Sequence, residues 1–253
     1  MSMLVPSDVE FQAVPPLAPI TGLPARINLR QRITRNQTRR YFLMQKSPLQ
    51  NRVTPTGEII ATAYRGSWMG NRGGRLHNDR RQLTAKRWTS KHWICCRLSF
   101  QGRQRQVMAA NRYTELFFLD EATAFAAGHR PCAECRRSDF NSFIRMWAEI
   151  RDRDERIYVR EIDNQLHLER LATGKVKRRH EARTHELPDG SFIFHQGHSM
   201  LVKGDSLLTW TPAGYTDRIS KSSVDRADLL TPPSLVGILQ TGFELRIHES
   251  SEP

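Results

Sequence analysis

The chain has 253 residues, and its 39 Lys and Arg against 26 Asp and Glu give a formal net charge of +13. No apolar run reaches the ~18–20 residues of a membrane-spanning helix, and the composition excludes collagen, coiled coils and secreted disulfide-rich scaffolds. Two acids in the first ten residues do not fit a secretion signal. We therefore expect a strongly basic cytoplasmic protein of one large or two small domains that does not act in a membrane.

Residues 1–53 are expected to be a disordered N-terminal extension. Four prolines between residues 15 and 24 prevent a regular helix. The segment that follows is rich in arginine and poor in residues large enough for a core.

From residue 54 onward, short apolar runs separated by glycine-rich turns predict β-strands. Gln101-Gly102 is a tight-turn pair, so the strand before it should fold back on residues 103–108 as a hairpin. The strands expected in this part cover residues 58–63, 92–100 and 113–119.

Three helices are expected next. Asp120 is a good N-cap for a helix over 121–127, which Gly128 ends. A longer helix over 140–151, capped by Ser138 or Asp139, carries an aromatic face at helical spacing. The third helix covers 160–173 and ends at Gly174.

Residues 175–186 are polar and fit either a linker or an edge strand. Three strands follow, separated by turn signals at 188–190, 196–197 and 204–205, and after another turn at 212–215 a last helix covers 234–240. This order predicts an α+β fold. A small α/β module with β-hairpins at 54–152 precedes a small antiparallel β module with flanking helices at 155–248.

The positive charge is concentrated in residues 65–112, which hold twelve bases and one acid, Asp79. Such an excess attracts polyanions, and nucleic acid is the main candidate because each neutralised phosphate releases counterions. The glycines and arginines at 70–78 would let backbone and guanidinium groups approach phosphate. A solvated basic face without a partner is the alternative. The candidate nucleic-acid contacts are Arg72, Arg75, Arg80, Arg81, Lys86, Arg87, Lys91, Arg103, Arg105 and Arg112.

All four cysteines lie between residues 95 and 135. Cys132 and Cys135 have the Cys-x-x-Cys spacing at which two thiolates can bind one tetrahedral Zn²⁺, and a redox dithiol or a disulfide is the alternative. Cys95 and Cys96 are neighbours in an expected strand, so their side chains point to opposite faces and both cannot easily bind the same ion. We favour Cys96 as the third ligand, with Cys95 as the alternative.

A closed structural zinc site needs a fourth ligand. His77 lies in a glycine-rich loop whose backbone freedom would let the side chain reach inward. His92 precedes Cys96 by four residues, ~13 Å in an extended strand, so it can share the ion only if the chain turns there. His77 and His92 rank equally, ahead of Cys95 and His129.

Residues 116–137, LFFLDEATAFAAGHRPCAECRR, resemble the second half of the Ada-type zinc-binding domain. The shared pattern is an aromatic strand, an alanine-rich helix, a glycine, and Arg-Pro-Cys followed two residues later by Cys. In that family the other two ligands are a Cys or His and, four positions later, a Cys, a spacing that His92 and Cys96 share. Here His129 stands where the family usually has an aromatic residue.

The resemblance implies a zinc site beside bound DNA. In the repair protein of that family, one zinc-bound thiolate accepts a methyl group from a phosphotriester. A histidine ligand would make the thiolates of this chain less nucleophilic, so the resemblance supports metal binding more than methyl acceptance.

The predicted function is zinc-dependent nucleic-acid binding, to DNA rather than RNA, accessory to DNA repair or processing. One alternative is an enzyme, either a zinc-thiolate alkyl acceptor or a phosphodiesterase in which His77 activates water. The other is a purely structural zinc in a protein-interaction module.

Overall fold

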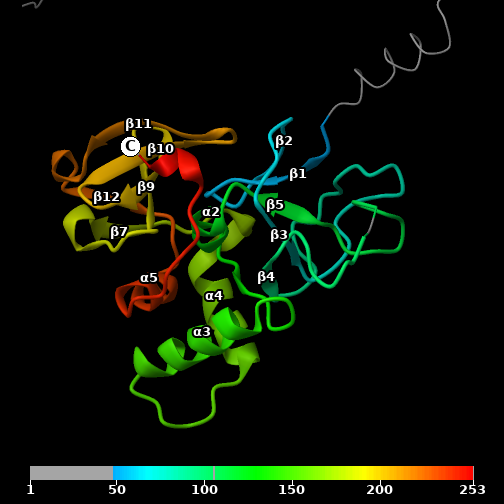
Figure 1. Ribbon diagram of the computed structural model, residues 1–253, viewed down its shortest axis with the longest axis horizontal. Helices are drawn as coiled ribbons and strands as arrows, with labels where there is room; N and C mark the ends of the chain where they lie inside the picture. Colours follow the sequence, from blue (N-terminus) through cyan, green and yellow to red (C-terminus); the bar gives the residue numbers. More distant parts are fainter. Residues whose placement is uncertain (1–47, 105, 253) are drawn as a thin grey trace, which may run out of the picture. The chain divides into compact units, whose positions relative to one another are not determined.

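Figure 1 shows a computed structural model of the chain, which describes residues 48–104 and 106–252. Most of the expected N-terminal extension lies outside these residues. Its last part does not: Gln50–Val53 form strand β1, because this segment pairs with β2 on one side and β5 on the other. The described residues belong to one compact unit, which contains both of the sheets described below.

Six short strands in the described residues form the first sheet, in the order β2-β1-β5-β3-β4-β6. Their neighbours are antiparallel except for β1 with β5 and β4 with β6, which run parallel. The strands are β1, β2 (Ile59–Ala61), β3 (Trp68–Arg72), β4 (Trp93–Cys96), β5 (Leu116–Phe118) and β6 (Arg130–Pro131). The β4–β6 pairing brings Cys96 beside the segment that leads into Cys132.

The hairpin expected around Gln101-Gly102 does not form. Both residues have positive φ, 52° and 63°, so the chain does turn there. However, β4 pairs with β3 and β6, and the described residues among 103–108 contain no strand. The expectation failed because β3 and β6 already occupy both edges of β4.

The helices follow the sequence pattern with shifted ends. Helix α2 (Glu121–Ala126) has the expected cap, with the Asp120 side chain accepting from the Thr123 N–H. Helix α3 (Arg137–Glu149) begins earlier than expected, directly after the Cys-x-x-Cys turn. Helix α4 (Val159–Arg170) ends earlier, because Leu171 is extended.

In the described residues, the second sheet has six antiparallel strands in the order β11-β10-β9-β8-β12-β7. The three expected strands and their turns are present, and the polar segment contributes an edge strand, β7. The strands are β7 (His180–Arg183), β8 (Phe192–His195), β9 (His198–Lys203), β10 (Ser206–Thr211), β11 (Gly214–Ser220) and β12 (Arg226–Leu229). Helix α5 (Pro233–Gln240) follows, so the α+β class is confirmed.

Helix α2 links the cores of the two sheets, and all of its residues are buried. Ala124 packs in the core of the first sheet, Phe125 in a cluster with α3, α4 and α5, and Ala122 against one face of the second sheet. Alanine is small enough to let both sheets approach the helix closely. The described residues contain no helix both long and apolar enough to cross a membrane.

Candidate metal centre

Three cysteines from two segments of the chain converge at one edge of the first sheet. Cys96 is the last residue of β4, and Cys132 follows β6 directly. The Cys132 N–H donates to the Cys95 carbonyl at 2.9 Å, which holds the start of the Cys-x-x-Cys turn against β4. The sulfur atoms of Cys96, Cys132 and Cys135 all lie within 4.8 Å of one another, and these three form the group in the described residues that could hold a metal ion.

The alternation of side chains along β4 separates the two neighbouring cysteines. Cys95 is fully buried in the core of the first sheet with Leu116 and Phe118. Cys96 points the other way and packs with Cys132 and Cys135. The structure therefore brings together the three cysteines that the sequence analysis grouped, and it places Cys95 elsewhere.

The three sulfurs fit a thiophilic ion. Zinc–sulfur bonds of about 2.3 Å place the sulfurs of a tetrahedral site about 3.8 Å apart, so the observed cluster needs little adjustment. The sulfurs also accept backbone hydrogen bonds, for example from the Glu134 N–H to Cys132 Sγ at 3.4 Å. The cysteines are 6 to 9% exposed, so the cluster is largely closed but retains some contact with solvent.

The cluster also stabilises a thiolate. Hydrogen bonds from the Cys135 and Cys96 thiols, followed by backbone N–H groups, lower the pKa of Cys132 below the ordinary value of a thiol. The contacts of Cys96 with Cys132 and Cys135 raise the pKa of Cys96, and the contact with Cys132 raises the pKa of Cys135. The cluster therefore favours a thiolate at Cys132, and a divalent ion bound here would displace the remaining thiol protons.

The structure does not bring the expected histidines into this cluster. His77 is buried, with its Nδ1 2.6 Å from Thr114 Oγ1 and its Nε2 3.1 Å from the Ala109 carbonyl. His92 lies just before the extended β4, exposed, with Nε2 3.6 Å from Asp163 Oδ2. His129 is buried and accepts from Arg72 Nε. Because β4 is straight, the chain does not make the turn that His92 would need to reach the ion.

Arg72, an expected nucleic-acid contact, is a core residue instead. Its side chain alternates inward with Trp68 and Gly70 along β3 and is 2% exposed. The guanidinium lies 4.0 Å from the centre of the Trp93 ring and donates to the Gly57 carbonyl. Burial lowers its pKa to about 9. It is therefore removed from the candidate surface, and Arg105 lies outside the described residues.

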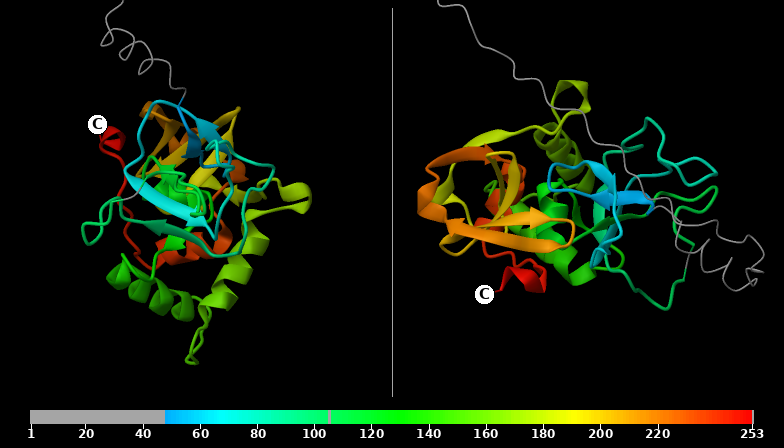
Figure 2. Two further views of the ribbon diagram at one scale, coloured as in Figure 1. Left: turned by 90° about the vertical axis from the view of Figure 1, so that its right-hand side faces the viewer. Right: turned by 90° about the horizontal axis from the view of Figure 1, so that it is seen from above.

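The other candidate bases lie in the loops β3–β4 and β4–β5, which Figures 1 and 2 show on the side of the first sheet that faces away from the second. Arg75 forms an ion pair with Asp79, and Arg81 is half-buried. The exposed members are Arg80, Lys86, Arg87, Lys91, Arg103 and Arg112.

Arg103 connects this basic surface to the cysteines. Its guanidinium pairs with Glu134, the exposed residue between Cys132 and Cys135, and lies 5.2 Å from the centre of the Phe100 ring. Phe100 in turn packs against the cysteine cluster. A cation thus stands at the rim of the candidate metal centre.

The sequence analysis missed Arg136, the residue that fixes the Cys-x-x-Cys turn. Its side chain is buried, contacts the Trp68 ring at 4.5 Å, and pairs with Glu121 of α2 and Asp139 of α3. A signal was present, because Arg136 directly follows Cys135 in the segment that resembles the zinc-binding domain.

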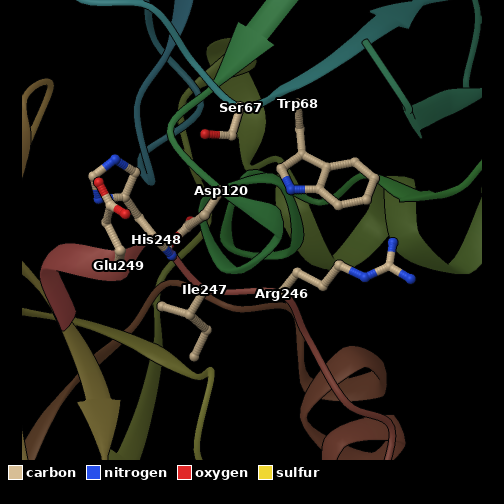
Figure 3. A pocket seen from close by; sticks show the side chains of 7 residues that line it. All are labelled: Ser67, Trp68, Asp120, Arg246, Ile247, His248 and Glu249. Carbon is tan, nitrogen blue, oxygen red and sulfur yellow. Dashed lines mark hydrogen bonds between the residues drawn. The ribbon is translucent and has the colours of Figure 1, made fainter. Parts of the chain in front are cut away.

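A pocket of about 380 Å³ beside Asp120 contains no cysteine. Figure 3 shows Asp120 between His248 and Glu249 on one side and Trp68 and Arg246 on the other. The Asp120 carboxylate is already satisfied by the Tyr215 hydroxyl at 2.6 Å, the His248 N–H and the Thr123 side chain and backbone. The carboxylate at the centre of this pocket therefore serves the capping of α2.

No protein-family model, curated protein or solved structure matches this chain. Its class is defined by its own fold and site: an α+β protein with a three-cysteine cluster that could hold a metal ion.

Proposed function

We propose that this protein holds Zn²⁺ at Cys96, Cys132 and Cys135 and binds nucleic acid, DNA rather than RNA, over the adjacent basic loops. The observation that carries the proposal is the convergence of three cysteine sulfurs beside loops that expose unusually many cations. Zinc is the natural ion because thiolates favour thiophilic metals and zinc is tetrahedral without redox chemistry.

Bound at this place, zinc would join β4 to the start of α3. Among the described residues the cluster supplies three ligands, and a fourth position stays open to water or another donor. Since Arg103 lies at the rim, the thiolate charge would be balanced by a cation that also faces solvent. The Ada-type resemblance of residues 116–137 belongs to this proposal, as does an accessory role in DNA repair or processing.

The nucleic-acid part rests on the exposed cations of the loops β3–β4 and β4–β5. Asp79 is the one acid in residues 65–112, and it is already paired with Arg75. Apart from Arg103, which pairs with Glu134, the exposed bases are therefore available to neutralise phosphates. The cytoplasm is the proposed compartment, because its thiols stay reduced and able to bind metal.

Native mass spectrometry tests the zinc site. We expect one zinc per unaltered chain and its loss in Cys96→Ala. Cys95→Ala is the matched control, because it removes the neighbouring sulfur from the opposite face of the same strand and should keep the zinc. A folded, zinc-free chain, or equal loss in both variants, contradicts the site.

Fluorescence anisotropy with a labelled DNA duplex tests the nucleic-acid surface. Affinity should fall steeply between low and moderate salt, and Arg80→Gln or Lys86→Gln should each reduce the salt slope by about 1. Arg226→Gln removes the same charge from the second sheet and should leave the slope unchanged. Binding that ignores salt, or an equal effect of Arg226→Gln, contradicts the surface. An RNA duplex of the same sequence tests the preference for DNA.

A second candidate is a zinc-thiolate alkyl acceptor. One observation favours it: the cluster in the described residues contains only sulfur donors, and a site without histidine keeps its sulfurs electron-rich. In such a transfer the phosphotriester O–C bond breaks as an S–C bond forms, and the phosphodiester leaves. Incubation with methylated DNA should then add one methyl mass to a peptide that contains Cys96, Cys132 or Cys135. No observation favours the phosphodiesterase, since both ring nitrogens of His77 have hydrogen-bond partners.

A further inference from the structure

The β8–β9 hairpin places two histidines opposite each other. His195 and His198 are register partners at the end of the ladder. The two residues between them, Gln196 and Gly197, have positive φ of 47° and 84°, as the tightest type of β-hairpin turn requires. The turn is therefore short, and it fixes the register of the pair.

Both histidines belong to the same face of the second sheet. Side chains alternate along a strand, so His195 shares its face with Ile193, and His198 shares its face with Met200. Ile193 and Met200 lie in one apolar cluster, which shows that the two faces are the same. Directly paired side chains on one face have Cβ atoms about 4.5–5.5 Å apart.

The surroundings leave room for both rings. Asp228 pairs with Phe194 and Leu229 with Ile193, and continuing this register by one residue places Ala227 beside His195. Ala182 is in turn the partner of Ala227. Small side chains on β12 and β7 therefore do not crowd the His195 imidazole, and continuing the β9–β10 register places Thr211 beside His198. His198 is exposed and His195 half-buried, so an ion can reach them from solvent.

The ring nitrogens of these two histidines also have no hydrogen-bond or ion-pair partner in the described residues. All nine histidines lie in the described residues, and seven of them have a hydrogen-bond or ion-pair partner there. His195 and His198 have no side-chain partner within that part of the chain. Two imidazoles with free lone pairs, held on one face by a tight turn, are the exception among the histidines of this fold.

We propose that His195 and His198 chelate a late first-row divalent ion such as Ni²⁺, Cu²⁺ or Zn²⁺. Imidazole nitrogen is a preferred ligand of these ions, with bonds of about 2.0–2.1 Å to zinc. Two protein ligands leave the other coordination positions to water or a chelator, so the site binds reversibly. The histidine site shares no residue with the cysteine cluster, and its test does not depend on the zinc proposal.

Retention of the untagged full chain on a Ni²⁺–nitrilotriacetate resin tests the proposal. The immobilised ion has two open positions, which a histidine pair can fill, whereas the cysteines are too buried to reach it. We expect the unaltered chain to be retained and to elute with imidazole. His195→Ala and His198→Ala should each pass through in the wash.

Two control variants distinguish the hairpin pair from the remaining metal-binding side chains of the protein. His185→Ala removes an exposed histidine outside the hairpin and should leave retention unchanged. Cys96→Ala should also be retained, because it affects only the other centre. Circular dichroism confirms that the hairpin variants are folded. Failure of the unaltered chain to bind, or retention that survives either hairpin substitution, overturns the proposal.

Discussion

The two sheets of this protein are stabilised by different means. Strands of the first sheet are 2 to 5 residues long, whereas those of the second are 4 to 7 and mostly joined by tight turns. Both faces of the second sheet are covered by apolar clusters. The first sheet instead packs beside buried charged groups, among them Arg72, Arg130 and Arg136.

The buried charged groups are confined to one part of the chain. Within the described residues, the buried charged side chains all lie between Arg72 and Arg170. Lys177 is an intermediate case, because its ammonium is enclosed and donates to the Ala126 carbonyl while the side chain as a whole is partly exposed. A region with short strands and long loops has less apolar surface to bury, so polar networks, and on our proposal a metal ion, must supply its rigidity.

The largest effect is expected from breaking the Arg130–Asp163 pair. Arg130 donates to both carboxylate oxygens at 2.8 Å and links β6 to α4, and the two side chains are 5% and 1% exposed. Arg130→Ala leaves the carboxylate buried without its main partner, which should lower the free energy of unfolding by about 3–5 kcal/mol. Urea denaturation measures the change.

A double variant sharpens this test. In Arg130→Met with Asp163→Leu, no charge is left unpaired, so most of the stability should return. If the double variant is as unstable as Arg130→Ala, the loss comes from packing, and the pair is not the support that we infer for the first sheet.

A smaller or similar loss in the free energy of unfolding is expected when a core side chain of the second sheet is truncated. Leu201 of β9 is fully buried among Phe192, Leu208 and Ala122. Leu201→Ala removes apolar contacts and leaves a cavity, at a cost of about 2–5 kcal/mol. Because the second sheet does not contribute to the cysteine cluster, the metal content of the folded variant should be unchanged in native mass spectrometry. Loss of metal from folded Leu201→Ala would show that the two sheets are not independent supports.

The same contrast explains what the sequence could predict. In the second sheet, alternating apolar residues and turns such as Gln196-Gly197 specify strands locally, and β8, β9 and β10 were found where expected. In the first sheet, β4 pairs with β3 across a 20-residue loop and with β6 from beyond α2, and no local pattern encodes those partners. The hairpin at Gln101-Gly102 was wrongly predicted because a local turn signal was read as strand pairing, whereas the partners of β4 are distant in sequence.

The candidate site shows the same limit. Spacing identified Cys132 and Cys135, and strand alternation required that Cys95 and Cys96 separate, but only the packing of Cys95 with Leu116 decides between them. Arg72 was misplaced because a charged residue on the inward face of β3 breaks the usual pattern of burial. It is accommodated by Trp93, which also has Arg170 at 3.9 Å from its ring centre.

At neutral pH the smallest effect is expected at His129, where a pH dependence that belongs to the first sheet develops only in acid. His129 is fully buried, 4.7 Å from the Phe118 ring, and burial, together with the nearby Arg72 and Arg170, holds its pKa well below the ordinary value. Below pH ~6.5 the unfolded chain therefore binds a proton that the folded chain does not, and stability falls by up to about 1.4 kcal/mol per pH unit for this group. His167, whose pKa burial and Arg170 lower to about 4, adds a second proton in the same window.

His129→Phe isolates the contribution of one histidine. Phenylalanine fits an aromatic surrounding and cannot be protonated, so below pH ~6.5 the slope of stability against pH should fall by up to one proton. Urea denaturation at several pH values measures the slope. At neutral pH the variant loses the hydrogen bond from Arg72, so its absolute stability should be lower while its acid sensitivity is reduced. An unchanged slope would mean that His129 is not the acid-sensitive group of the first sheet.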